Sequence, residues 1–425
     1  MIEKKEFLKV TLIEFIDSPP VVNAASMLAL SPDRVVLIGS RESALLALKE
    51  RLFSLASAKM SKNELAKLPK IVIKQTQPND IKGIAAIIEG FLSQDHCVCD
   101  MLGGDEAALV ALGMAASRYP VSLHTADIKR GSLHALLNAD DALKKASCPR
   151  LTADEAIALY GGKITARTEL SSLSAENVAD IMRLWRICSK DTAAWNKNLT
   201  KIRHTLSEIG SAPGELNVLY EKPDKFKTPL KYFLKELSKA RLIENLRFDG
   251  KELSFRFKDS LIRKCLTKDG LILEIYTSLI GKNIRNSQGE PMFCDIQSGV
   301  VIDWDGKTAR EIHDKVGGVP YDTVNEIDAL FMQGLVPVFI SCKNGQVDTD
   351  ELYKLNTVAW RFGGKYAGKI LVSTYANIPE AMHARAKDMG ITLLCGVDRT
   401  TDPKLCDGIM RDIPFETRIF EAVSE

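Results

Sequence analysis

Two polar pairs lie on neighbouring apolar segments in the C-terminal third of the chain. Glu326 and Asp328 stand near the start of TVNEIDALFMQGLVPVFISCKNG, and Ser341 and Lys343 stand near its end. Residues two apart on a strand share one face, so each pair presents both side chains on the same side. Antiparallel strands around a turn near Gln333-Gly334 would place residue 328 opposite about 339, and residue 326 opposite about 341. The four polar side chains are therefore expected to converge.

The chemistry that such a group could perform is metal-dependent hydrolysis of a phosphodiester. A lysine placed among carboxylates costs free energy unless it is paired, so the arrangement needs a reason. Carboxylate oxygens hold Mg(II) or Mn(II), which neutralises the phosphate and lowers the pKa of a bound water. The Lys343 ammonium would stabilise the developing charge or orient the water. Glu274, on the apolar helix predicted for LILEIYTSLIG, supplies a further carboxylate.

These residues resemble the PD-(D/E)xK nuclease core of the restriction-endonuclease-like fold. Asp328 is followed thirteen residues later by Ser341-x-Lys343, and ELYKLNTVAWRFGGKYAGKILVST fits the helix and strand that follow the catalytic hairpin in that fold. Ser341 departs from the motif, which usually has a second carboxylate there. The missing charge would come from Glu326, Glu274 or Glu351, and Glu326 is the preferred candidate because it is expected almost opposite Ser341. An accidental ion pair on a β-hairpin is the alternative interpretation.

The first half of the chain alternates between strand and helix patterns. The strands are predicted at KVTLIEFID, RVVLIGS, KIVIKQT and HCVCDMLGG, with helices of 10 to 18 residues between them. This alternation is typical of a parallel, Rossmann-like α/β sheet with helices on both faces. Ligands bind such sheets at the carboxyl ends of the strands.

Two of these strand ends carry residues suited to ligand binding. One has Ser18 and, further on, Asn23; the other has Gly103-Gly104 followed by Asp105 and Glu106. Two glycines let a backbone approach a phosphate or a ribose, and the following helix offers free N–H groups. A glycine turn with an acidic N-cap explains the second site equally well from spacing alone. No GxGxxG follows the first strand, which argues against a dinucleotide dehydrogenase.

The middle segment, 151–265, is predicted to be a connector. LTADEAIALYGGKI and AENVADIMRLWRICSKDTAAWNKNLTKIRHTLSEIG are expected to be helical. LKYFLKELSKARLIENLRFDGKELSFRF is expected to form a helix and two strands joined at Asp249-Gly250, an order similar to that of a winged helix. Its basic residues could contact a nucleic-acid backbone, although a solvated helix face explains them too.

The whole order resembles the CRISPR-associated Rossmann-fold (CARF) nucleases of type III CRISPR systems. The resemblance is carried by LGGDEAALVAL, LTADEAIALYGGKI, NEIDALFMQGLVPVFISCKNG and FGGKYAGKILVS. It implies three domains: a sensor at 1–150, the connector at 151–265, and a nuclease at 266–425. It also implies a homodimer, activation by a cyclic oligoadenylate, with the tetramer as the expected ring, and cleavage of single-stranded or nicked DNA and sometimes RNA. The ligand residues that it implies are Ser18, Asn23, Ser40, Arg41, Gly103, Gly104 and Asp105.

Composition sets the remaining expectations. The chain has 425 residues, 57 basic and 55 acidic, so its net charge of +2 indicates no global attraction to nucleic acid or membranes. No apolar run reaches the roughly 18 residues that a membrane helix needs, and a cytoplasmic protein without structural zinc is expected. Two other functions stay open: a repair or junction nuclease without nucleotide gating, and a ligand-sensing regulator with an inactive nuclease fold.

Overall fold

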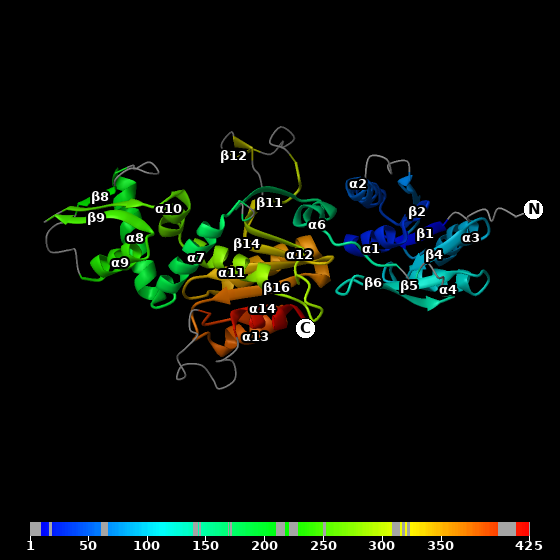
Figure 1. Cartoon of the computed structure of the whole chain (residues 1–425). Coiled ribbons are helices and arrows are strands. Elements are labelled where there is room, and N and C mark those ends of the chain that lie inside the picture. The colour runs from blue at the N-terminus through cyan, green and yellow to red at the C-terminus, as the bar shows by residue number, and fades with distance from the viewer. Residues whose placement is uncertain are drawn as a thin grey trace, which may run out of the picture.

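The computed structural model describes residues 10–16, 19–60, 67–138, 143, 146–168, 170, 172–209, 217–220, 228–249, 252–307, 315–316, 319–320, 324–397 and 414–424. Three parts follow one another in a row, with the N-terminal domain, the predicted sensor, at one end, the winged-helix-like part at the other, and the nuclease-like sheet between them (Figure 1). No helix in the described part of the chain is long and apolar enough to cross a membrane.

The sensor domain is a six-stranded sheet in the order β3-β2-β1-β4-β5-β6, parallel except for the β5–β6 pair. Its elements are β1 (Val10–Phe15), α1 (Pro20–Leu30), β2 (Arg34–Gly39), α2 (Glu42–Lys59), β3 (Lys70–Gln75), α3 (Ile81–Leu92), β4 (His96–Asp100), α4 (Glu106–Ala116), β5 (Ser122–Asp127) and β6 (Ser132–Leu137). Successive strand residues point to opposite faces. Leu12 therefore packs with α1 and α2, and Ile13 packs with α3 and α4.

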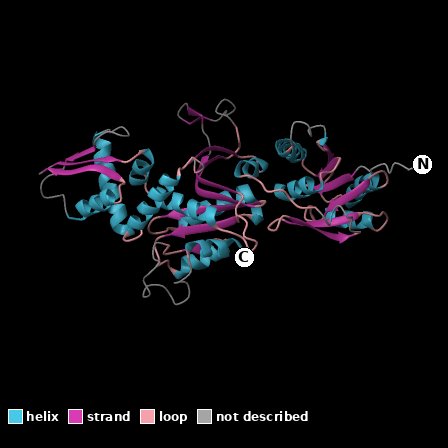
Figure 2. Cartoon of the chain, viewed as in Figure 1, coloured by secondary structure: helices cyan, strands magenta, loops and turns pink. Residues whose placement is uncertain are grey.

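The winged-helix-like part is an insertion of helices and a small antiparallel sheet, β8-β10-β9 (Figure 2). Its elements are α7 (Ala175–Cys188), α8 (Thr192–Ile209), β8 (Asn217–Tyr220), α9 (Thr228–Lys239), β9 (Ile243–Asp249), β10 (Glu252–Phe257) and α10 (Ser260–Thr267). The expected hairpin is present, and Gly250 of its turn lies outside the described residues.

The nuclease-like domain is built on a mixed sheet in the order β17-β16-β15-β14-β11-β7. Its elements are α6 (Ala153–Leu159), β7 (Lys163–Thr168), α11 (Leu271–Asn283), β11 (Asp295–Asp303), β14 (Val324–Gln333), β15 (Val336–Lys343), α12 (Thr349–Gly363), η2 (Gly364–Tyr366), β16 (Gly368–Ser373), α13 (Glu380–Asp388), β17 (Thr392–Leu394) and α14 (Phe415–Ser424); a separate two-stranded ribbon joins β12 (Lys315–Val316) to β13 (Val319–Pro320). The helix α12 covers one face of the sheet and α11 covers the other.

One element differs from expectation. The segment LTADEAIALYGGKI was expected to begin a helical connector, with a break at Gly161-Gly162; α6 before the break is helical, but the strand β7 follows it. β7 pairs antiparallel with β11, so residues 163–168 belong to the nuclease-like sheet. The predicted connector, 151–265, wrongly included them. The winged-helix-like part is therefore inserted between two strands of one sheet.

Candidate functional site

The β14–β15 hairpin brings Asp328 and Ser341 together. The carboxylate Oδ2 of Asp328 accepts a hydrogen bond from the Cys342 backbone N–H at 2.6 Å and from the Ser341 hydroxyl at 3.2 Å. Burial raises the pKa of Asp328, and these two hydrogen bonds together with the charge of Lys343 oppose that rise. The predicted convergence of these two side chains is therefore present.

The hairpin register differs from expectation by two residues. Ala329 pairs with Ile340 and Gln333 with Val336, which places residue 328, and not 326, next to Ser341. The turn is centred on Gly334 and Leu335, and Gly334 has a φ of +63°, which favours glycine. A shift of one residue in the turn centre moves the pairing by two, so the facing of the side chains is unchanged.

Lys343 lies on the same face and pairs with a carboxylate of α12. Its Nζ is 2.9 Å from Oε2 of Glu351, whose other oxygen is 3.4 Å from Lys354 Nζ. Glu351 is held in the first turn of α12, where its backbone N–H bonds to the N-cap Asp348. The residues around these groups enclose a cavity of about 350 Å³, lined by Glu326, Asp328, Ser341, Lys343, Glu351 and Lys354 among others. A polar pocket thus opens between the hairpin and α12.

Glu326 stands at the rim of this pocket. It is half-exposed and forms an ion pair with Lys268 at 2.8 Å. Burial lowers the pKa of Lys268, but the hydrogen bond to Glu326 and the fields of Glu274, Glu326 and Asp328 together raise it above its ordinary value. Lys268 is a second cation near the carboxylates that the sequence analysis missed. It precedes α11 by three residues, and only the tertiary packing brings it to this site.

Glu274 reaches the site from the other face of the sheet. It lies on α11 and is 5% exposed, and Oε2 has no hydrogen-bond partner among the residues that the structure describes. Burial, reinforced by the charge of Asp328, raises the pKa of Glu274 to about 8. The structure therefore brings Asp328, Ser341, Lys343 and Glu326 to one pocket, and places Glu274 behind it within electrostatic reach.

The carboxylates of the site have the donor chemistry that a divalent metal requires. Within the described residues, no three His, Cys, Asp or Glu side chains are already gathered as metal ligands. The donor chemistry nevertheless fits, because Glu274 has a buried, unpartnered oxygen and both Glu274 and Asp328 have pKa values raised by burial. A cation between them would stabilise both in the ionised form. Asp328 and Glu274 are the residues best suited to hold it.

The sensor residues gather at the carboxyl edge of the parallel sheet. Ser40 and Arg41 follow β2, and Gly103 and Gly104 follow β4, with β1 between these two strands. Arg41 is exposed. Gly104 has a φ of +89°, and a Cβ there would lie 2.7 Å from Ala108 Cβ, so glycine is required.

Asp105, Asn23 and Ser18 complete the set of expected ligand residues. The Asp105 carboxylate caps α4 by accepting from the Ala108 N–H at 2.8 Å, as the alternative interpretation of this turn had it. Asn23 is fully buried, and its amide donates to Glu14 Oε2 at 2.6 Å and to the Phe15 carbonyl, so its side chain does not reach the edge surface. Ser18 lies outside the described residues.

A buried polar network beneath this edge was missed by the sequence analysis. Ser26 donates to Asp100 Oδ2 at 2.7 Å and lies 2.9 Å from His124 Nε2, while Asp100 Oδ1 accepts from the Leu102 N–H at 2.8 Å. Asp100 therefore fixes the loop that leads into Gly103-Gly104. The position of Asp100 at the end of an otherwise apolar strand was the available signal.

The sensor and the nuclease-like domain meet at the C-terminal end of α12. Arg361 of α12 donates to the carbonyls of Tyr160, at 2.6 Å, and Trp304, at 3.2 Å. A Cβ at Gly364 would lie 3.7 Å from Pro19 in the loop that follows β1. One helix thus joins the sensor edge to the pocket that holds Glu351.

Comparison with known proteins agrees with this architecture. No protein-family model and no curated protein sequence matches the chain. Protein VC1899 from Vibrio cholerae has a similar structure, with a TM-score of 0.70, 15% identity, and 97% of this chain and 98% of that chain covered. Can2 from Sulfobacillus thermosulfidooxidans, solved in complex with cyclic tetra-adenylate, has a TM-score of 0.63, 14% identity, and 98% and 97% coverage. Over nearly its full length the chain therefore shares its fold with VC1899 and Can2: the predicted Rossmann-like sheet, followed by a mixed α/β domain into which the winged-helix-like part is inserted instead of connecting the two.

Proposed function

We propose that this protein is a metal-dependent endonuclease of type III CRISPR antiviral defence that is activated by a cyclic oligoadenylate. The observation that carries the proposal is the pocket in which Asp328, Ser341, Lys343 and Glu351 meet at one edge of a restriction-endonuclease-like sheet. The likeness in fold to Can2, which was solved with cyclic tetra-adenylate, supports the choice of activator.

Each residue of the pocket has a distinct part in the proposed reaction. Asp328 and Glu274 would hold Mg(II) or Mn(II), with Glu326 as a further carboxylate at the rim. The ion supplies charge neutralisation of the phosphate and a more acidic water. Lys343 would donate to the scissile phosphate once its ion pair with Glu351 is exchanged for the substrate. Ser341 keeps Asp328 oriented through its hydroxyl, and Lys268 adds positive charge where the strand would approach.

Gating would act through the sensor edge. The ring would contact the exposed surface near Ser40, Arg41, Gly103 and Gly104, and in a homodimer it would lie across two such edges. Binding can change activity only if the ring prefers one arrangement of the domains over the other. Gly364 directly follows α12 and lies so near Pro19 that an added Cβ would be 3.7 Å from it, and the bonds of Arg361 anchor the same end of the helix, so α12 would connect the neighbourhood of the edge to Lys343 through Glu351.

The test is cleavage of single-stranded DNA, single-stranded RNA and supercoiled plasmid in manganese or magnesium, with and without cyclic tetra-adenylate. We expect cleavage of DNA only with both the metal and the ring present, and a loss of about 100-fold or more in Lys343→Ala and Asp328→Ala. The exposed residues Lys387 and Asp388 of α13 provide matched controls, Lys387→Ala and Asp388→Ala. Ring-independent cleavage would instead indicate a repair-type nuclease.

A second candidate function rests on Ser341. A hydroxyl in place of a carboxylate leaves the pocket one charge short, which suits a nucleic-acid-binding regulator with an inactive nuclease fold. Binding of the ring without cleavage of any of the three substrates would favour that function.

A further inference from the structure

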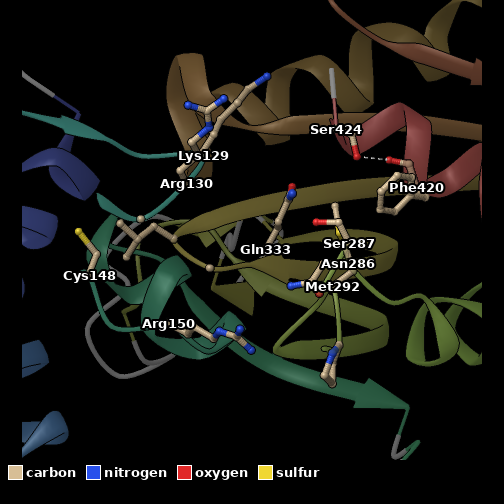
Figure 3. A pocket seen from close by; sticks show the side chains of 14 residues that line it. Lys129, Arg130, Cys148, Arg150, Asn286, Ser287, Met292, Gln333, Phe420 and Ser424 are labelled. Atoms are coloured by element: carbon tan, nitrogen blue, oxygen red, sulfur yellow. Dashed lines mark hydrogen bonds between the residues drawn. The ribbon is translucent and has the colours of Figure 1, made fainter. Parts of the chain in front are cut away.

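A second polar cavity lies at the junction of the sensor and the nuclease-like domain. It has a volume of about 380 Å³ and is bordered by the turn between β5 and β6, the segment that leaves the sensor, the turn between β14 and β15, the loop after α11, and α14 (Figure 3). This volume falls in the range of small-molecule sites, roughly 300–1,000 Å³. The cavity shares no residue with the pocket of Asp328 and Lys343, and its Gln333 and Gly334 lie at the opposite end of the hairpin.

The charge of this cavity is strongly one-sided. Lys129, Arg130 and Arg150 line it, and none of its described lining residues is an Asp or a Glu. Arg130 is 3.8 Å from the half-buried Asp127, and Arg150 is 3.3 Å from the exposed Glu290; both carboxylates lie outside the lining, and both arginine side chains are exposed. Ion pairs in water contribute little free energy and exchange readily for a better anion. The described lining of the cavity therefore carries positive charge only, which suits an anionic ligand.

The part of the lining formed by the loop after α11 and by α14 carries uncharged groups. Asn286 and Ser287 contribute an amide and a hydroxyl, and Phe420 and Met292 contribute apolar surface. Figure 3 shows Phe420 on the side of the cavity away from Cys148, with Asn286, Ser287 and Met292 between Phe420 and Gln333. An aromatic ring beside hydrogen-bonding groups suits a nucleobase and its sugar, as three cations suit its phosphate.

The walls are joined by main-chain hydrogen bonds. The Cys148 N–H bonds to the Gly131 carbonyl at 2.9 Å, and the Leu151 N–H bonds to the Gly334 carbonyl at 3.0 Å. The first bond fixes the departing segment to the sensor turn, and the second fixes it to the nuclease hairpin. The cavity is thus formed before any ligand arrives, which reduces the conformational cost of binding.

We infer that this junction cavity is a binding site for the phosphate of a nucleotide unit, distinct from both the nuclease pocket and the loops at Ser40 and Gly103. The unit could be a free mononucleotide or one residue of a nucleic-acid strand, since both carry the same chemistry. The site does not require that the chain be a ring-activated nuclease, so it goes beyond the proposed function. Because sensor and nuclease residues share it, an occupant would hold the two domains in one arrangement.

The experiment measures binding to the full-length protein by calorimetry and fluorescence anisotropy. The probes are adenosine 5′-monophosphate, adenosine, a fluorescein-labelled single-stranded oligonucleotide, and cyclic tetra-adenylate. One variant removes the charge, Lys129→Gln with Arg130→Gln and Arg150→Gln, and a second, Ser287→Phe, fills the cavity without changing its charge. The control replaces three exposed sensor lysines with glutamine, at Lys67, Lys70 and Lys82.

We expect the monophosphate to bind at least about tenfold more tightly than adenosine, and both cavity variants to weaken it by about tenfold or more. The control should stay within about twofold of the parent. Loss of oligonucleotide binding in both cavity variants, without monophosphate binding, would identify a strand as the source of the phosphate.

Three outcomes would overturn the inference. Both phosphate probes could bind the cavity variants as tightly as the parent. The charge variant alone could lose binding while Ser287→Phe does not, which would mean general attraction without a site. Binding of cyclic tetra-adenylate could be the sole property lost, which would make the cavity part of the ring site. If cleavage proves not to depend on cyclic tetra-adenylate, the proposed function fails, but the binding test with the monophosphate still decides this inference.

Discussion

Ser341 sets the charge of the candidate catalytic pocket. Its hydroxyl donates to the same Asp328 oxygen that accepts from the Cys342 N–H, so it satisfies this carboxylate without adding a negative charge. Glu326 cannot replace the missing carboxylate without leaving Lys268, with which it pairs. The pocket therefore has less negative charge for a divalent ion than a pocket with a second carboxylate at residue 341.

A Ser341→Glu variant should bind the metal more tightly and be less stable without it. The new carboxylate would lie beside Asp328, whose pKa burial already raises, so repulsion should lower the free energy of unfolding in chelator by about 1–3 kcal/mol. A divalent ion relieves this repulsion, and the manganese concentration for half-maximal thermal stabilisation should fall about tenfold. Ser341→Gln is the uncharged control of the same size. Equal metal dependence in the two variants would refute the account.

Glu274 makes stability depend on pH. Its pKa of about 8 in the folded chain lies above its ordinary 4.5, so the folded state holds a proton that the unfolded state releases between these values. Without metal, the contribution of Glu274 to the free energy of unfolding should be complete below about pH 4.5. It should decrease as the pH rises towards 8. The loss should amount to a few kcal/mol at most.

Urea unfolding in chelator at several pH values checks this prediction. Glu274→Gln should lose less stability than the parent between pH 5 and pH 8, because the amide never ionises. Parallel curves for the two proteins over this range would show that Glu274 is not protonated in the folded state. Added manganese should flatten the curve of the parent alone.

The helix α12 reaches from the pocket of Lys343 at its first turn to the neighbourhood of the predicted sensor at its last turn. Glu351 in its first turn contacts Lys343, and Arg361 in its last turn bonds to the Tyr160 and Trp304 carbonyls. The Arg361 guanidinium also lies 5.8 Å from the Trp304 ring centroid and 4.8 Å from that of Phe362. Movement of the sensor against this end would be carried along a rigid helix.

Arg361→Ala should therefore reduce activation more than ring binding. We expect the affinity for cyclic tetra-adenylate to stay within about twofold, and the stimulation of cleavage to fall by roughly fivefold or more, within the usual size of a coupling free energy. Arg385→Ala is the control, because Arg385 contacts Tyr353 on the outer side of α12. If activation by the ring is intact in Arg361→Ala, the coupling runs through another contact.

The elements that the sequence predicted well are those whose pattern is local. The strands and helices of the sensor follow from alternation, and the facing of Asp328, Ser341 and Lys343 follows from spacing of two along a strand. β7 was missed because KITART has only one buried residue besides its partly buried end, and its strand geometry depends on pairing with distant β11. The positions of Lys268 and of the Asp100 network also depend on tertiary packing, which no local pattern contains.

The whole molecule is held together by cores that cross the domain boundaries. One apolar cluster includes Leu45 and Leu52 of the sensor helix α2 together with Val358 and Phe362 of α12. A second joins the winged-helix-like part to the other face of the nuclease-like sheet. The domains are therefore expected to unfold together.

Tryptophan fluorescence offers a direct test, because the four tryptophans, 185, 195, 304 and 360, all lie outside the sensor. Saturating cyclic tetra-adenylate should raise the midpoint of tryptophan-detected thermal unfolding by several degrees, since a ligand of the folded sensor stabilises everything that unfolds with it. The Gly104→Ala variant, strained at its φ of +89°, should lose most of this rise. A sensor that melts independently would leave the midpoint unchanged.

The late partner of β7 also sets an order of events during synthesis. Thr165 donates to the carbonyl of Val301, 136 residues further along the chain. At roughly 5–20 residues per second, β7 leaves the ribosome about 7 to 27 seconds before its partner strand exists. During that interval the sheet that carries Asp328 and Lys343 cannot close. A growing chain therefore cannot assemble this pocket until β11 and the strands after it have been made.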